Sequence, residues 1–228
     1  MLGNRLWFPD PKQTAASGRI NGLVAVGGDL SVSRLLLAYR SGIFPWGDEP
    51  ITWWSPDPRA IFELDGFHVP RSLKRVLRQG VFEITIDRAF RAVIESCAVA
   101  GPGRGDTSWI TPRFVEAYTR LHEAGHAHSV ECWQHGKLAG GVYGVALGGL
   151  FAGESMFHRV SNASKAALAA LVARLQQRGF TLFDIQMITP ATAPLGAELI
   201  SRDDYLARLV AAIRLDCDFA GPAPRGMG

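Results

Sequence analysis

Hydrophobic and polar positions between residues 127 and 187 follow patterns that predict consecutive strands, then a helix, then one more strand. Short apolar runs separated by polar or Gly-rich turns indicate the strands, and apolar residues at helical spacing indicate the helix, which closes at Gly179. The expected elements are strands over 128–133, 138–147 and 150–157, a helix over 162–178 and a strand over 181–187. Because a crossover helix joins parallel strands, the last strand should run parallel to a neighbour in a mixed α/β layer.

The flanking segments predict shorter elements. Ser31 or Ser33 should cap a short amphipathic helix that stops at Gly42. Residues 43–59 contain three tryptophans and four prolines, a density that predicts a rigid aromatic loop. Further expected elements are a strand over 81–86, a helix over 88–98, a flexible loop over 101–106, a helix beginning at Pro112 and a last helix capped by Ser201.

One predicted strand carries a carboxylate among apolar neighbours. Glu154 and Ser155 lie between Leu150 and Phe157, directly before the predicted helix, for which Ser161 or Asn162 is a natural N-cap. Burying a carboxylate is costly unless it has a partner or a chemical task. Glu154 is therefore a candidate functional residue.

The last strand of this region carries two polar residues on one face. Asp184 and Gln186 are two positions apart, where a buried strand would otherwise place hydrophobic side chains. Near Glu154, they would form a pocket of two acids and an amide. Spacing alone leaves a catalytic pocket and a polar network that holds the sheet together equally open.

Aromatic and basic residues elsewhere suggest ligand contacts. Trp53 and Trp54 are expected in the core, whereas Trp46 is favoured as a stacking platform, and Trp109 fits either role. Four cations recur at helical spacing without an interleaved acid, a pattern that favours phosphate binding over a merely solvated face. They are Arg71, Lys74, Arg75 and Arg78.

Composition narrows the class of protein. The 228 residues are 47% hydrophobic, enough for a sizeable core, and the net charge of +3 does not by itself indicate a nucleic-acid partner. No apolar run approaches the roughly 18–20 residues of a membrane span, and the N-terminus lacks a hydrophobic signal core, so we expect a cytoplasmic protein without membrane contact. The three cysteines are widely spaced and predict neither disulfides nor a zinc site.

A sequence that matches a zinc-peptidase motif is not expected to bind metal. His122-Glu-Ala-Gly-His126 fits the H-E-x-x-H pattern, which needs both histidines on one unbroken helix. Gly125 occupies a position typical of a helix C-terminus, and a strand follows at once. We therefore predict no metal site here.

The chain resembles the leucyl/phenylalanyl-tRNA–protein transferase family in blocks that follow one another along nearly its whole length. These blocks are Phe44-Pro-Trp46, Trp53-Trp-Ser-Pro-Asp-Pro-Arg59, Trp109-Ile-Thr111, Ala127-His-Ser-Val-Glu131, Gly141-Val-Tyr-Gly-Val145, Gly153-Glu-Ser-Met-Phe157, Ala163-Ser-Lys165 and Leu195-Gly-Ala197. The chain departs from the family at Ala191-Thr-Ala-Pro194, where a histidine is common, and at His158, where serine is usual.

The resemblance implies a bacterial cytosolic aminoacyltransferase that needs no cofactor. Such an enzyme moves leucine or phenylalanine, with methionine as a further donor, from tRNA to proteins that begin with Arg or Lys and marks them for degradation in the N-end-rule pathway. It has no DNA partner. The implied architecture is a small N-terminal α/β domain over 1–65, a basic helix and connecting segment over 66–110, and an acetyltransferase-like (GNAT-type) mixed-sheet domain over 111–228.

The resemblance also implies roles for single residues. Asp184 and Gln186 match a catalytic relay, and Glu154 matches an acid near the reacting amine. Trp46 and Trp109 match tryptophans that hold the terminal adenosine of the tRNA. The four cations of the basic helix fall where the tRNA backbone is contacted, and the apolar amino-acid pocket would include Phe151, Met156, Leu168 and Phe183.

Two other functions remain open from the residues. An acyl-CoA-dependent N-acyltransferase would cradle pyrophosphate with a Gly-rich turn before the helix, but Arg159-Val-Ser-Asn-Ala-Ser164 contains no glycine. A tRNA-binding module without catalysis would use the basic helix and the tryptophans alone. That function would leave Glu154, Asp184 and Gln186 with a packing role only.

Overall fold

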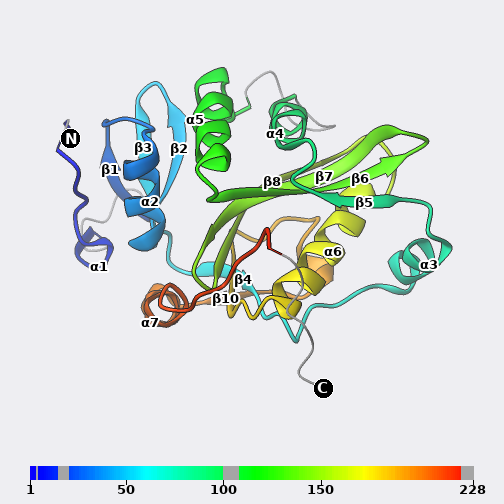
Figure 1. The fold of residues 1–228 in the computed structure, drawn as a ribbon. Coiled ribbons are helices and arrows are strands. Elements are labelled where there is room, and N and C mark those ends of the chain that lie inside the picture. The colour runs from blue at the N-terminus through cyan, green and yellow to red at the C-terminus, as the bar shows by residue number, and fades with distance from the viewer. Residues whose placement is uncertain (4, 15–20, 100–107, 222–228) are drawn as a thin grey trace.

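The computed structural model describes residues 1–3, 5–14, 21–99 and 108–221, so the loop expected over 101–106 lies outside the described residues. Two sheets form its framework (Figure 1). The smaller is antiparallel in the order β1-β3-β2. Its strands are β1 (Leu23–Val26), β2 (Phe44–Asp48) and β3 (Ile51–Trp54), accompanied by α1 (Pro11–Thr14) and α2 (Val32–Arg40).

The larger sheet has seven strands in the order β10-β4-β9-β8-β7-β6-β5. Five of its six strand pairs need no crossover helix because they are antiparallel, whereas β8 and β9 are parallel. The expected mixed sheet is confirmed. The strands are β4 (Arg59–Phe62), β5 (Glu83–Ile86), β6 (Ala127–Gln134), β7 (Lys137–Leu147), β8 (Leu150–His158), β9 (Leu182–Gln186) and β10 (Ala197–Ile200).

Helices cover both faces of this sheet. α4 and α5 lie on one face and α6 on the other, while α3 lies at one end (Figure 1). One hydrophobic cluster packs under α2, α4 and α5, and a second packs between α6 and the sheet. The helix bounds are α3 (Arg71–Gln79), α4 (Phe90–Ala98), α5 (Pro112–Glu123), α6 (Ala163–Gln177) and α7 (Arg202–Ala212), with a 3₁₀ turn at Ala193–Leu195.

The strand and helix predictions for residues 127–187 are confirmed to within one or two residues, including the parallel course of β9. Ser31 and Ser201 are the N-caps of α2 and α7, and their hydroxyl oxygens accept backbone bonds from Arg34 and Asp204. Asn162 occupies the N-cap position of α6, but its side chain makes no cap bond. No helix among the described residues is long and apolar enough to cross a membrane.

The prediction of an aromatic loop over 43–59 was wrong in its central part. β2 and β3 form a hairpin there, and Trp53 is fully buried in it, whereas Trp54 is only half-buried. The prolines are compatible with the hairpin because β2 is an edge strand, where the missing N–H of Pro45 costs no inner ladder bond. β4, which follows directly, already belongs to the larger sheet.

Candidate active site

The site forms where β8 and β9 separate. The two strands pair at Leu150–Leu182, Phe151–Phe183 and Ala152–Asp184, and the ladder then ends. Beyond this point each strand contributes one polar side chain to the opening. Gln186 Nε2 donates a hydrogen bond to Glu154 Oε1 at 3.1 Å, so the acid and the amide singled out from sequence meet across the gap.

Asp184 lies just below this opening and is fully buried. Arg59 of β4 donates two parallel hydrogen bonds to its carboxylate, from Nε to Oδ1 at 2.8 Å and from Nη2 to Oδ2 at 2.6 Å. The hydroxyl of Tyr205 on α7 adds a third bond to Oδ2 at 2.9 Å, and the Arg59 guanidinium also lies over the Tyr205 ring. A bidentate arginine is the partner that makes burial of a carboxylate tolerable.

Asp184 shapes the backbone at Gln186. The amide N–H of Gln186 donates to Asp184 Oδ1 at 2.9 Å, a local bond that turns the chain at the end of β9. Gln186 has a φ of 58°, in the left-handed region that side chains other than glycine rarely adopt. Such strain is found at functional sites when the surroundings hold it, and here it directs the Gln186 amide toward Glu154.

Glu154 has a different environment from Asp184. The Tyr118 hydroxyl of α5 donates to its Oε2 at 3.2 Å, and the Tyr39 hydroxyl of α2 is hydrogen-bonded to that of Tyr118. Burial raises the pKa of Glu154 from an ordinary value of 4.5 to about 7, although hydrogen bonds from the tyrosines oppose this shift. The carboxylate can therefore exchange a proton near neutral pH.

The two predicted adenosine-binding tryptophans lie on neighbouring segments. Trp46 is half-buried and stands edge-on to Trp54 at 6.2 Å, and Trp109 is half-buried and stands edge-on to Phe114 at 5.4 Å. The Thr111 hydroxyl bonds to the carboxylate of Asp48, which ties the two segments together. Both rings pack against the cluster under α2, α4 and α5.

The predicted amino-acid pocket lies in the cluster on the α6 side of the sheet. Phe151, Leu168 and Phe183 are buried there, and Met156 is half-buried against them. The rings of Phe151 and Phe183 meet edge-on at 5.8 Å. Since Phe183 and Asp184 are consecutive on β9, their side chains lie on opposite faces of the sheet.

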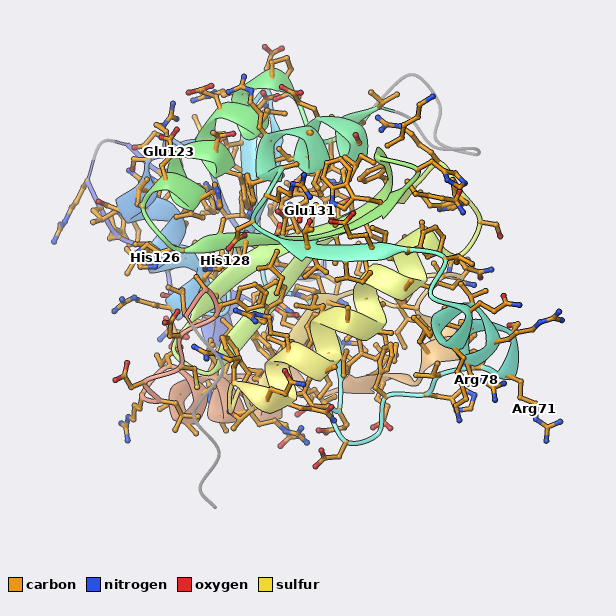
Figure 2. All side chains as sticks on the ribbon, turned by 45° about the vertical axis from the view of Figure 1, so that its right-hand side comes forward. Arg71, Arg78, Glu123, His126, His128 and Glu131 are labelled. Carbon is orange, nitrogen blue, oxygen red and sulfur yellow. The ribbon has the colours of Figure 1, made fainter. Side chains whose placement is uncertain are left out.

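The predicted basic helix is α3. Its four cations are exposed while Leu73 is buried, so one face is anchored and the charged face is solvated. Figure 2 shows Arg71 and Arg78 projecting from α3 at the opposite end of the molecule from His126 and His128. The structure therefore does not bring the basic helix next to those histidines.

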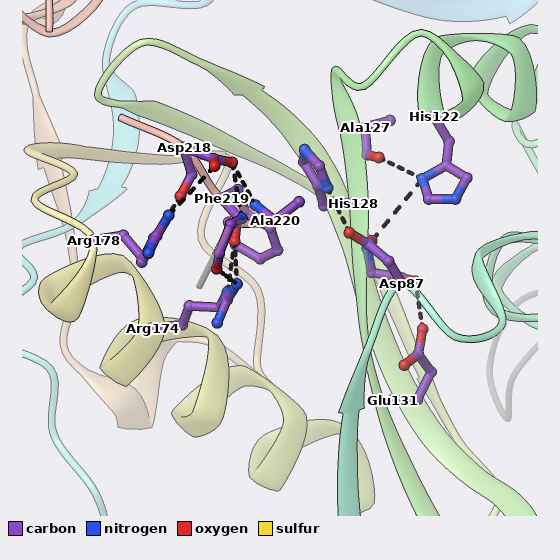
Figure 3. Close-up of polar contacts among 12 residues, drawn as sticks. Asp87, His122, Ala127, His128, Glu131, Arg174, Arg178, Asp218, Phe219 and Ala220 are labelled. Atoms are coloured by element: carbon purple, nitrogen blue, oxygen red, sulfur yellow. Dashed lines mark hydrogen bonds and ion pairs between the residues drawn. The ribbon is translucent and has the colours of Figure 1, made fainter. Parts of the chain in front are cut away.

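A separate group of titratable side chains has hydrogen-bond partners within the protein. Asp87, His122 and His128 place three possible metal-ligand atoms within 4.8 Å of one another (Figure 3). His128 Nδ1 lies 2.7 Å from Asp87 Oδ2, and His122 Nδ1 lies 2.7 Å from the Ala127 carbonyl. That carbonyl requires a proton on His122 Nδ1, so this nitrogen has no lone pair for a metal in the observed arrangement.

The motif that resembles zinc peptidases is broken as expected. α5 ends at Glu123, and Gly125 has a φ of 79°, so His126 lies outside the helix that carries His122. A cavity of about 430 Å³ adjoins His126, His128 and the C-terminal segment around Phe219. None of the three predicted catalytic residues lines it.

The hydrogen-bond partners of Glu154, Asp184 and Gln186 were not identified from the sequence. Arg59 was noted only as the end of a motif, and Tyr39 and Tyr118 were not singled out. A signal was present, because buried tyrosines and arginines need hydrogen-bond partners. Nothing in the sequence says which partners these are, since Arg59 and Asp184 are 125 positions apart.

Comparison with known proteins places these residues in a family. The profile described as leucyl/phenylalanyl-tRNA protein transferase matches residues 61–210, and the profile for the N-terminal domain of that family matches residues 28–57. The leucyl/phenylalanyl-tRNA–protein transferase of Oleidesulfovibrio alaskensis is 51% identical over 94% of this chain and 88% of its own. That of Citrobacter koseri is 51% identical over 89% and 85%.

Similar solved structures are much more distant. A GCN5-related N-acetyltransferase from Kribbella flavida aligns with a TM-score of 0.40 at 13% identity, over 72% of this chain and 58% of its own. This likeness is too remote to bear on function. The two profiles and the relatives at about half identity, in contrast, span most of the sequence. The chain belongs to the leucyl/phenylalanyl-tRNA protein transferase family.

Proposed function

We propose that this aminoacyltransferase moves leucine or phenylalanine, with methionine as a further donor, from aminoacyl-tRNA to the α-amine of proteins that begin with Arg or Lys. The observation that carries the proposal is the Glu154–Gln186 pair at the opening between β8 and β9, 3.1 Å apart in a member of this family. It offers an acid and an amide to an incoming amine. Such a product would be marked for N-end-rule degradation in the cytoplasm.

The chemistry asks for alignment more than for a strong catalyst. An aminoacyl ester is already activated, and holding an amine against its carbonyl is worth roughly 7–11 kcal/mol. A terminal amine has a pKa of about 7.7–8.0, so freeing its lone pair near pH 7 costs only about 1 kcal/mol. A cofactor is not required for this reaction.

The central residues have distinct roles in this proposal. Gln186 accepts a hydrogen bond from the attacking amine through its side-chain oxygen, since its nitrogen is used by Glu154. Asp184 orients Gln186 through the backbone bond of 2.9 Å. Glu154 attracts the cationic end of the acceptor protein.

Other parts of the chain would hold the tRNA. Trp46 and Trp109 offer half-buried ring faces for the terminal adenosine, and the exposed cations of α3 offer contacts to the tRNA backbone. The aminoacyl side chain would enter the apolar cluster that contains Phe151, Met156, Leu168 and Phe183. An apolar pocket of this kind fits leucine, phenylalanine and methionine and rejects charged side chains.

Incubation with radiolabelled leucyl-tRNA and two short peptides tests the proposal. The peptides differ only in their first residue, Arg or Ala. We expect label on the Arg-initiated peptide alone. Binding of leucyl-tRNA without transfer to either peptide would instead make the chain a tRNA-binding module, and equal labelling of both would refute the proposed acceptor class.

A further inference from the structure

We propose that Glu154 is the group that takes the proton from the attacking amine, and that Tyr118 and Tyr39 are positioning residues that hold its carboxylate ready. The inference rests on the proposed aminoacyl transfer and adds the destination of its proton. Of the groups at the opening between β8 and β9, the geometry selects Glu154 because the other two are unsuited.

Asp184 is unsuited because its oxygens are occupied by donors. Oδ1 accepts hydrogen bonds from Arg59 Nε and from the backbone N–H of Gln186. Oδ2 accepts hydrogen bonds from Arg59 Nη2 and from the Tyr205 hydroxyl. Protonating this fully buried carboxylate would leave the Arg59 charge without a counter-ion. Asp184 is therefore a positioning residue.

Gln186 is unsuited because an amide does not hold a proton near neutral pH. Its nitrogen donates to Glu154 Oε1 at 3.1 Å, which leaves its oxygen to accept from the amine. An amine bound to that oxygen would stand beside Glu154, because the two side chains already touch. Gln186 therefore places the amine, and the neighbouring carboxylate can receive the proton.

Glu154 has the supports that a proton acceptor needs. The Tyr118 hydroxyl of α5 donates a hydrogen bond to Glu154 Oε2, and the Tyr39 hydroxyl of α2 is hydrogen-bonded to that of Tyr118. Two linked hydroxyls therefore hold Oε2, while Gln186 contacts the other carboxylate oxygen. Burial and the Asp184 charge raise the Glu154 pKa, while the tyrosines and Arg59 lower it, with about 7 as the result. A base that titrates near the working pH is the most effective one.

The proposed step balances without another reactant. As the bond forms between the amine nitrogen and the ester carbonyl carbon, one N–H proton moves to Glu154. The bond from that carbon to the ribose oxygen then breaks, and its electron pair stays on the oxygen. The ribose oxygen takes the proton from Glu154, which returns to the carboxylate.

The pH dependence of transfer tests this step. We would measure kcat/KM for an Arg-initiated peptide with saturating leucyl-tRNA from about pH 5.5 to about 9 in the wild type, Glu154→Gln, Tyr118→Phe and Tyr143→Phe. In the wild type, log(kcat/KM) should rise with slope two below about pH 7, because the carboxylate and the amine must both lose a proton. Glu154→Gln should lose about 10²–10⁴-fold and retain only the slope of one from the amine.

The tyrosine variants separate this role from a merely structural one. Tyr118→Phe removes a hydrogen bond to the Glu154 carboxylate and so raises its pKa. The part of the pH profile that reports Glu154 should therefore move to higher pH. Tyr143→Phe removes a hydroxyl from the same aromatic cluster without touching the Tyr118–Glu154 bond, and its profile should match the wild type.

The outcomes that overturn the inference differ from those that overturn the function. Proton uptake by Glu154 is refuted, while transfer itself stands, if the kcat/KM of Glu154→Gln is within threefold of the wild type. It is also refuted if kcat/KM of Tyr118→Phe rises at the same pH as in the wild type. A wild type that labels no peptide at any pH refutes the proposed function. If circular dichroism shows that Glu154→Gln does not fold, the pH profile of Tyr118→Phe by itself decides the question.

Discussion

Two carboxylates on adjacent strands of the candidate site have different environments. Asp184 is neutralised by Arg59 and shapes the backbone, whereas Glu154 accepts hydrogen bonds from the Tyr118 hydroxyl and the Gln186 side-chain nitrogen, and burial raises its pKa to about 7. The alternation of β9 was enough to predict that Asp184 and Gln186 share a face. The left-handed backbone of Gln186 was not predictable, because it depends on a side-chain bond within the turn.

Removing Arg59 should destabilise the fold more than removing an exposed arginine. Arg59→Ala leaves the Asp184 charge buried without a counter-ion, which typically costs about 3–5 kcal/mol in the free energy of unfolding. Arg208→Ala is the matched control, because its bond to Glu63 is exposed and worth at most about 1 kcal/mol. Urea unfolding of both variants measures the difference, and equal losses would contradict the assigned role of Arg59.

Glu154→Gln should change how stability depends on pH. Because the folded protein raises the Glu154 pKa from 4.5 to about 7, this group favours folding fully below about pH 4.5 and loses that contribution as the pH rises to about 7. A glutamine does not titrate. The variant should therefore be more stable relative to the wild type at pH 8 than at pH 5 in urea unfolding, and a difference that does not change with pH would be inconsistent with the raised Glu154 pKa.

At the scale of elements, periodicity predicted the strands and the helix over residues 127–187 but not the hairpin of β2 and β3. β8, α6 and β9 follow directly from the spacing of their apolar residues. The hairpin of β2 and β3 was missed because its prolines and tryptophans read as a loop, and only its edge position makes them compatible with a strand. The separation of β8 from β9, which creates the site, leaves no local pattern in the sequence.

The charged face of α3 should affect tRNA binding in a salt-dependent manner. Arg75→Ala removes one exposed cation, and each lost phosphate contact lowers the slope of log affinity against log salt by about 0.7–0.9. Arg214→Ala, an exposed arginine that follows α7, is the control and should leave the slope unchanged. Filter binding of leucyl-tRNA across a salt series measures both slopes, and equal slopes would place the tRNA elsewhere.

At the scale of the whole molecule, distant segments complete the sheet and its core. β10 pairs with β4, and β5 pairs with β6, across long stretches of sequence that no periodicity connects. After α7 the chain returns to α6, where Arg174 donates a hydrogen bond to the Phe219 carbonyl (Figure 3). The Phe219 ring stacks on that of Phe151 with the ring centroids 5.2 Å apart. No pattern in the sequence around Phe219 predicted this packing.

Phe219 should contribute to global stability although it lies near the C-terminus. Its ring is 2% exposed within the cluster under α6, so Phe219→Ala should cost about 3–5 kcal/mol in the free energy of unfolding. Leu215→Ala is the control in the same segment, because Leu215 is 41% exposed and should cost less than about 1 kcal/mol. Thermal or urea unfolding of both variants measures the contrast, and a small loss for Phe219→Ala would mean that the tail does not close the core.

The most direct test of the account is single-turnover transfer from leucyl-tRNA to an Arg-initiated peptide by the wild type, Gln186→Ala and Gln177→Ala. Gln177 is an exposed glutamine at the last position of α6, before β9 begins at Leu182, whereas Gln186 is the last residue of that strand, and Gln177 therefore serves as the matched control. If the opening between β8 and β9 performs the reaction, Gln177→Ala should match the wild type and Gln186→Ala should be slower by about 100-fold or more. A Gln186→Ala rate within threefold of the wild type would contradict this assignment of the active site.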